Sequence, residues 1–116
     1  MTITRIEPGP RMSNAVIHNG VVYLSGLVGR DGEDVATQTR AALADVDRLL
    51  ALAGTDKSHL ISATIWLADM ADFAAMNTVW DAWVDPANTP ARATGESRLA
   101  KDKYRVEVMI TAALPR

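Results

Sequence analysis

The chain has 116 residues, with 12 Lys and Arg against 14 Asp and Glu, no cysteine, and an apolar content of 48%. Length and composition predict a single globular domain over residues 1–116, and the net charge of −2, without any run of basic residues, argues against a nucleic-acid partner. The absence of cysteine excludes disulfides, thiolate nucleophiles and zinc–sulfur sites, and the lack of a long uninterrupted apolar stretch predicts a cytoplasmic protein without membrane contact.

The N-terminal part of the chain predicts short β-strands. Residues 2–7 alternate well enough for an edge strand, which the segment Pro8-Gly9-Pro10 would end. Residues 15–18 and 21–26 are rich in β-branched side chains and are joined by Asn19-Gly20. An Asn-Gly pair favours a tight hairpin because both turn positions need a positive φ.

The middle of the chain predicts a helix, a strand and a second helix. Apolar residues recur at helical spacing between residues 34 and 53, and Gly54 is a suitable C-terminal end. Residues 60–68 are typical of a strand. We expect Asp69 to cap the second helix and Asp72 to lie in its first turn. Its buried stripe is predicted to contain Phe73, Met76, Trp80, and Trp83 or Val84, before Asp85-Pro86 ends it.

Two further strands are predicted at residues 91–97 and 104–113, and the second alternates clearly. The predicted order is therefore β-β-β-α-β-α-β-β, an α+β domain whose two helices pack on one side of a mixed sheet. The second face of such a sheet has no cover within one chain. We expect another copy of the chain to cover it.

Most of the usual catalytic constellations are absent from the sequence. His18 and His59 are the only histidines, each beside a predicted turn, and both favour surface positions. No cluster of carboxylates accompanies them, so we expect no metal site. No phosphate-binding glycine loop and no nucleophile elbow is present, and we therefore expect no cofactor.

A few polar residues occupy positions where polarity is costly. Asn77 lies on or beside the apolar stripe of the second helix, as a boundary amide or as a pocket residue. Glu107 lies opposite Val106 and Val108 on the last strand, where it is either a solvated acid or, under an oligomer, a partly buried one. Arg92 leaves a proline-bearing turn, which suits either a surface residue or a clamp for a planar carboxylate.

Ser25-Gly26 closes the first hairpin, and its glycine serves either packing or the close approach of a ligand to the backbone. From these residues alone, the sequence predicts an oligomeric α+β domain with a candidate anion pocket.

Taken together, several stretches resemble the Rid family of reactive intermediate/imine deaminases, also called YjgF-like. The matching segments are Tyr23-Leu24-Ser25-Gly26, residues 49–54, 63–69 and 72–77, and Thr89-Pro90-Ala91-Arg92, with Glu107 of Val106-Glu107-Val108 fifteen residues after that arginine. The likeness covers nearly the whole chain. The short loop before Pro90 and the segment Trp80-Asp81-Ala82-Trp83 are most similar to the YoaB-like branch.

The resemblance implies a chorismate-mutase-like α+β fold and a homotrimer whose sheets meet in the centre, with ligand pockets in the clefts between subunits. It also implies hydrolysis of small 2-imino or 2-enamine carboxylic acids to 2-keto acids and ammonia, without a cofactor. An imine carbon is already electrophilic, so fixing the carboxylate and presenting one water suits so sparse a site.

Carried over by position, Arg92 matches the arginine that clamps the substrate carboxylate, and Glu107 matches the glutamate that orients or activates water. Asn77, Ser25 and Gly26 match other pocket positions. The chain departs from the family at two positions: Met12 stands where many members carry an aromatic residue, and Thr94 stands where they often carry cysteine. These departures affect the expected side-chain preference for the substrate and leave the carboxylate clamp intact.

Two other functions compete with the deaminase. The first is a non-catalytic module in which the same pocket binds a keto acid or a similar anion and the protein acts on a partner. The second is the nuclease activity attributed to some relatives, which the acidic net charge and the missing basic patch disfavour.

Overall fold

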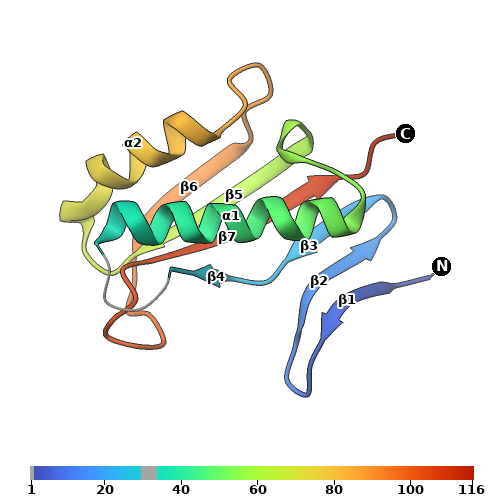
Figure 1. The fold of residues 1–116 in the computed structure, drawn as a ribbon, viewed down its shortest axis with the longest axis horizontal. Helices are drawn as coiled ribbons and strands as arrows, with labels where there is room; N and C mark the ends of the chain where they lie inside the picture. Colours follow the sequence, from blue (N-terminus) through green and yellow to red (C-terminus); the bar gives the residue numbers. More distant parts are fainter. Residues whose placement is uncertain (1, 30–33) are drawn as a thin grey trace.

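Residues 2–29 and 34–116, which the computed structural model describes, form one mixed β-sheet with two α-helices on a single face (Figure 1). The 3-10 turns Lys57–His59 (η1) and Met70–Asp72 (η2) lie directly before β5 and α2. The remaining elements are β1 (Thr4–Pro8), β2 (Ser13–His18), β3 (Val21–Leu24), β4 (Leu27–Val28), α1 (Val35–Ala53), β5 (Leu60–Leu67), α2 (Phe73–Trp83), β6 (Ala91–Glu96) and β7 (Val106–Ala113).

The strand order across the sheet is β1-β2-β3-β7-β5-β6, and the short β4 also pairs with β7. Strands β5 and β6 are parallel, and the other pairs are antiparallel. Helix α2 makes the long crossover that a parallel pair requires. Strand β6 therefore lies at an edge of the sheet, with β5 between it and β7.

The ends of α1 and of the first hairpin follow directly from the sequence. The Asp34 carboxylate accepts a hydrogen bond of 2.8 Å from the Thr37 backbone N–H, and Gly54 ends the helix with a φ of 90°. Asn19 and Gly20 have φ values of 53° and 76°, which confirms the predicted turn between β2 and β3.

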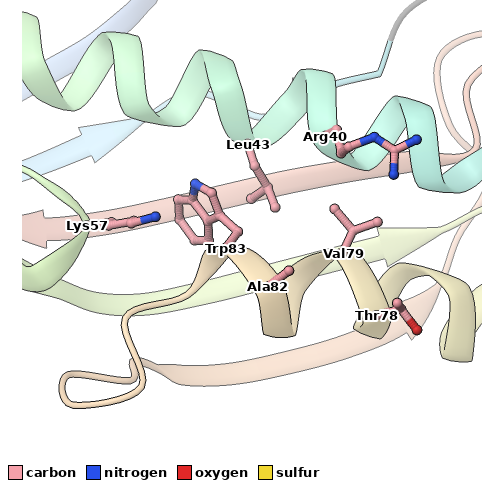
Figure 2. Close-up of a pocket in the computed structure, with 7 residues that line it drawn as sticks. All are labelled: Arg40, Leu43, Lys57, Thr78, Val79, Ala82 and Trp83. Carbon is pink, nitrogen blue, oxygen red and sulfur yellow. The ribbon is translucent and has the colours of Figure 1, made fainter.

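The core lies between the sheet and the helices. On β7, Val106, Val108 and Ile110 are at most 2% exposed, and burying each aliphatic side chain contributes about 1.5–3 kcal/mol. Leu43 of α1 lies toward α2 in the close-up of the two helices (Figure 2). The stripe predicted for α1 is confirmed, with Val35, Ala42, Leu43, Val46, Leu49 and Leu50 all buried.

Among the described residues, no helix lies on the second face of the sheet (Figure 1). Its exposed side chains include Tyr23 on β3 and Met109 on β7, which are 47% and 42% exposed. They line a shallow hollow of about 420 Å³ together with polar residues of β5 and β7 such as Ser62 and Thr111. This surface, the open face, is the uncovered side that the sequence predicts.

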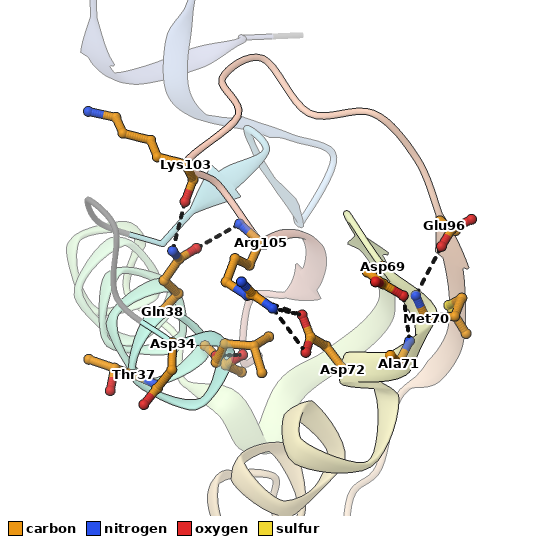
Figure 3. A network of polar contacts seen from close by, with 12 residues as sticks. Asp34, Thr37, Gln38, Asp69, Met70, Ala71, Asp72, Glu96, Lys103 and Arg105 are labelled. Carbon is orange, nitrogen blue, oxygen red and sulfur yellow. Dashed lines mark hydrogen bonds and ion pairs between the residues drawn. The ribbon is translucent and has the colours of Figure 1, made fainter.

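A buried amide connects α1 to the start of β7 (Figure 3). The Gln38 side chain is fully buried, donates to the Lys103 carbonyl at 2.9 Å and accepts from the Arg105 backbone N–H at 2.8 Å. The Arg105 guanidinium binds Asp72 through Nη2 at 3.0 Å. These contacts hold residues 103–105 against the helix layer, so β7 begins at Val106 and not at residue 104 as predicted.

The structure also corrects three smaller expectations. The strand predicted over residues 21–26 ends at Leu24, and β4 follows it as a separate strand. Asp69 caps the turn η2 through the Ala71 backbone N–H, so α2 begins only after Asp72. Phe73, the first residue of α2, is 39% exposed, whereas Met76 and Trp80 are buried as predicted and Val79 completes their stripe.

Within the part of the chain that the structure describes, neither helix combines the length and the apolar character that a membrane crossing requires.

Candidate functional site

Arg92 lies on the edge strand β6 and points toward the helix layer. Its backbone pairs with Ala63 of β5, whose side chain is buried under the helices. Its Nη2 donates a hydrogen bond of 2.8 Å to Oδ1 of Asn77 on α2. The structure thus brings together two of the residues that the sequence selected, and it places Asn77 at the boundary of the apolar stripe as expected.

The aromatic ring of Trp80 supports the same guanidinium. Trp80 lies one turn after Asn77 on α2 and is 6% exposed, and the guanidinium carbon of Arg92 is 5.2 Å from its ring centre. A cation over an indole face is attracted by the ring quadrupole. Because the ring covers one face of the guanidinium, a carboxylate binds in the guanidinium plane, through the N–H groups of Arg92.

Arg92 keeps most of its hydrogen-bonding capacity. A guanidinium carries five N–H groups, and the bond to Asn77 uses one of them. Among residues 2–29 and 34–116, no carboxylate forms an ion pair with Arg92. Asn77 is neutral, so the half-buried guanidinium retains its positive charge for an anion.

Glu107 lies on the opposite face of the sheet. Its strand neighbours Val106 and Val108 are buried under the helices, so the Glu107 side chain points to the open face. Its backbone pairs with Val28 on one side and Trp66 on the other. The residue is half-buried, and within the described part of the chain its carboxylate forms no hydrogen bond or ion pair.

Gly26 leaves the space that the Glu107 carboxylate occupies. A Cβ added at residue 26 would lie 2.7 Å from Oε2 and 2.9 Å from the carboxyl carbon of Glu107. Any other residue at this position would push the carboxylate aside. This contact matches the packing interpretation of Gly26, and the close approach of a ligand to its backbone stays a prediction.

Two hydroxyls among the predicted site residues are buried without partners. Ser25 Oγ and Thr94 Oγ1 have no hydrogen-bond partner among the described residues. Thr94 pairs with Ile65 on the helix face of β6, the same face as Arg92. Because buried hydroxyls are nearly always satisfied, these two oxygens are candidates for contact with a bound molecule or a second chain.

The last of the sequence candidates, Met12, and the two histidines lie elsewhere. Met12 is 52% exposed in the turn between β1 and β2, outside the strands β6 and β7 that carry Arg92 and Glu107. His18 and His59 are half-buried beside turns and approach Thr2 and Asp56, respectively. In the described ranges, no group of three or more His, Asp or Glu side chains is placed to hold a metal ion.

Sequence reasoning missed two tryptophans of the site. The spacing of Trp80 from Met76 fits an apolar stripe and predicts a core residue. Its position three residues after Asn77 was the sequence signal that Trp80 also contacts the Arg92 guanidinium. Trp66 lies beside Glu107 on the open face and covers Gly95, where an added Cβ would be 3.1 Å from the indole ring. Only the pairing of β5 with β6 and β7 reveals that contact.

Known proteins match this chain over nearly its whole length. A sequence profile of the family described as Endoribonuclease L-PSP matches residues 2–114. The RutC family protein YoaB of Escherichia coli strain K12 is 45% identical over 114 residues, which are 98% of this chain and 100% of that protein. The 2-iminobutanoate/2-iminopropanoate deaminase of Capra hircus is 31% identical over 103 residues, which are 83% of this chain and 74% of that protein.

A crystal structure of a YjgF-family protein from Neisseria meningitidis has the same fold. It matches with a TM-score of 0.98 at 50% identity and covers 100% of this chain and 98% of that one. This match confirms the fold that the resemblance implied, an α+β domain of the chorismate-mutase-like type.

Proposed function

This chain belongs to the Endoribonuclease L-PSP family, on the YoaB-like branch of the Rid (YjgF) proteins, and we propose that it hydrolyses small 2-imino carboxylic acids. Water adds to the imine carbon and the carbon–nitrogen bond breaks, which gives a 2-keto acid and ammonia. The deaminase relative supports this chemistry by its name, and the observation that carries the proposal is the Arg92 guanidinium, which has no ion-pair partner among the described residues.

Arg92 holds the substrate carboxylate. Two of its unused N–H groups donate in parallel to the two carboxylate oxygens, a geometry that fixes orientation as well as position. Asn77 and Trp80 prevent the guanidinium from turning, so the orientation is set before the substrate arrives. The free hydroxyl of Thr94, two residues along the same strand, is available to the carboxylate or to the imine nitrogen.

Glu107 positions the attacking water. An ionised carboxylate accepts hydrogen bonds, so it orients a water and takes its proton as the oxygen adds to the imine carbon. Glu107 passes this proton to the nitrogen, which gives a carbinolamine, and the hydroxyl proton of that carbinolamine follows to the nitrogen as the carbon–nitrogen bond breaks and ammonia leaves. Gly26 keeps the Glu107 carboxylate at the surface of the sheet, and Ser25 supplies a neighbouring hydroxyl.

The two halves of this site come from different copies of the chain. Arg92 and Glu107 lie on opposite faces of the sheet, and β5 separates their strands, which are therefore roughly 10 Å apart. A substrate held by Arg92 of one copy meets Glu107 when the open face of a second copy packs beside β6. The exposed Tyr23 and Met109 favour such an assembly, for which the family resemblance suggests a trimer.

Trapping the imine tests the reaction. An amino-acid oxidase generates 2-iminopropanoate and 2-iminobutanoate in situ, and semicarbazide traps the imine that remains. We expect the protein to lower semicarbazone formation and Arg92→Ala to abolish the effect, with Arg92→Lys keeping part of it because a charge without the planar fork remains. An Arg92→Ala variant that stays folded and turns over normally would refute the proposal.

The same variants separate catalysis from binding alone. If the protein is a non-catalytic anion module, keto acids such as 2-oxobutanoate raise its melting temperature through Arg92 while imine trapping stays unchanged. That result would replace the deaminase by the binding module.

A further inference from the structure

A groove between the two helices lies on the side of the molecule away from the open face (Figure 2). It has a volume of about 380 Å³, within the range of small-ligand sites. Leu43 of α1 and Val79, Ala82 and Trp83 of α2 give it an apolar lining. We call this the interhelical groove. A second copy on the open face would leave it uncovered.

Cations lie at opposite ends of the interhelical groove: Arg40 on α1 and Lys57 in η1 (Figure 2). Within residues 2–29 and 34–116, neither side chain forms an ion pair. Arg40 Nη2 donates a long hydrogen bond of 3.3 Å to the Thr37 hydroxyl. Lys57 Nζ lies 5.3 Å from the centre of the Trp83 ring, so that cation already has an aromatic partner.

Three carboxylates in the segments beside the groove accept hydrogen bonds from N–H groups. Asp34 caps α1 through the Thr37 backbone N–H, and Asp47 accepts from the Trp83 indole N–H at 3.0 Å. Asp85 accepts from the Ala87 backbone N–H and from the Asn88 side chain, both at 3.0 Å. The Arg40 guanidinium therefore keeps N–H donors for an anion at its end of an apolar groove.

From these contacts we propose that the interhelical groove binds a small aromatic carboxylate, a site separate from the one at Arg92. The carboxylate binds the planar fork of Arg40, which suits two parallel hydrogen bonds. The aromatic ring lies on Leu43, Val79 and Ala82 and reaches the indole of Trp83. The volume and the single unpaired fork favour a ligand of one or two fused rings with one acidic group.

Calorimetry with 2-naphthoate tests the site, with neutral 2-naphthamide as the matched probe. For a fragment of this size we expect a Kd of roughly 0.1–1 mM for the naphthoate and no measurable binding of the amide. Arg40→Gln is expected to weaken naphthoate binding at least tenfold. Arg48→Gln is the matched control, because it removes one positive charge from the same helix at a residue that forms a salt bridge with Glu7. It should leave the Kd for naphthoate unchanged.

Two more variants decide where the naphthoate binds. Ala82→Phe fills the groove from an exposed position and should abolish binding while the protein keeps its melting temperature. Arg92→Ala should leave the Kd unchanged. The proposal fails if the wild type gives no binding, if the amide binds as well as the naphthoate, or if binding is lost in Arg92→Ala and kept in Arg40→Gln.

Discussion

Arg92 of β6 and Asn77 of α2 are joined by a hydrogen bond of 2.8 Å between Nη2 and Oδ1. The bond crosses from the edge of the sheet to the helix layer and orients the guanidinium through a neutral amide. An amide oxygen positions the cation without neutralising it, and the charge stays available to an anionic ligand.

Replacing the amide by an acid should therefore harm activity more than removing it. In Asn77→Asp the new carboxylate pairs with Arg92 and competes with the substrate, and we expect kcat/KM to fall roughly 100-fold or more. Asn77→Ala loses only the orienting bond, and we expect a fall of about tenfold. Steady-state kinetics with the semicarbazide trap measure both values, and equal activity of the Asp variant and the wild type would contradict the role of Asn77.

A methyl group at residue 26 should displace the Glu107 carboxylate and leave the fold intact. The nearest atom to the added Cβ, at 2.7 Å, is the flexible end of the glutamate side chain. We expect Gly26→Ala to lower kcat about tenfold or more, since the water loses its acceptor, while the free energy of unfolding changes by less than about 1 kcal/mol. Urea unfolding combined with kinetics checks the prediction, which an unchanged kcat would overturn.

Gln38 should be important for stability and not for the chemistry. Its buried amide satisfies the Lys103 carbonyl and the Arg105 N–H, and both groups lose that partner in Gln38→Leu. We expect the free energy of unfolding to fall by about 2–4 kcal/mol. Urea denaturation measures it. A loss below about 0.5 kcal/mol would show that water replaces both bonds at no cost.

Asp34 should make α1 sensitive to acid. Hydrogen bonds from the Thr37 backbone and side chain hold the pKa of Asp34 below its ordinary value. A lowered folded-state pKa stabilises the protein above the unfolded-state pKa of about 3.9, and this contribution is lost as the pH falls through the folded value. Asp34→Asn still caps the helix but does not titrate there. Between pH 5 and pH 2 we expect the melting temperature of the wild type to fall more steeply than that of the variant, and parallel curves would contradict this.

Periodicity was sufficient to predict most of the fold. The stripe from Val35 to Leu50 and the Asn19-Gly20 turn are local signals, and the structure confirms both. The two-residue strand β4 was missed because its pairing with β7 depends on long-range contacts that two residues cannot signal. Gln38 was also missed, since a polar residue on an apolar stripe gives no sequence signal until its backbone partners are known.

The candidate site was predictable as a set of residues and not as an arrangement. Alternation along β7 placed Glu107 on the open face. The face of the sheet to which the Arg92 side chain points, however, depends on the register of β6 against β5, which only the folded chain determines. The sequence therefore selected Arg92 and Glu107 but could not show that one sheet separates them.

Mixing two inactive variants tests most directly whether Arg92 of one copy and Glu107 of another form one hydrolytic site. Arg92→Ala and Glu107→Ala, each carrying a different affinity tag, are unfolded together, refolded at equal amounts and purified over both tags to obtain mixed assemblies. If each site takes its arginine and its glutamate from different copies of the expected trimer, every purified mixed assembly has both residues intact in about one site of three, and imine hydrolysis returns to about a third of the wild-type rate. Mixed assemblies that are no more active than the separate variants would contradict the account.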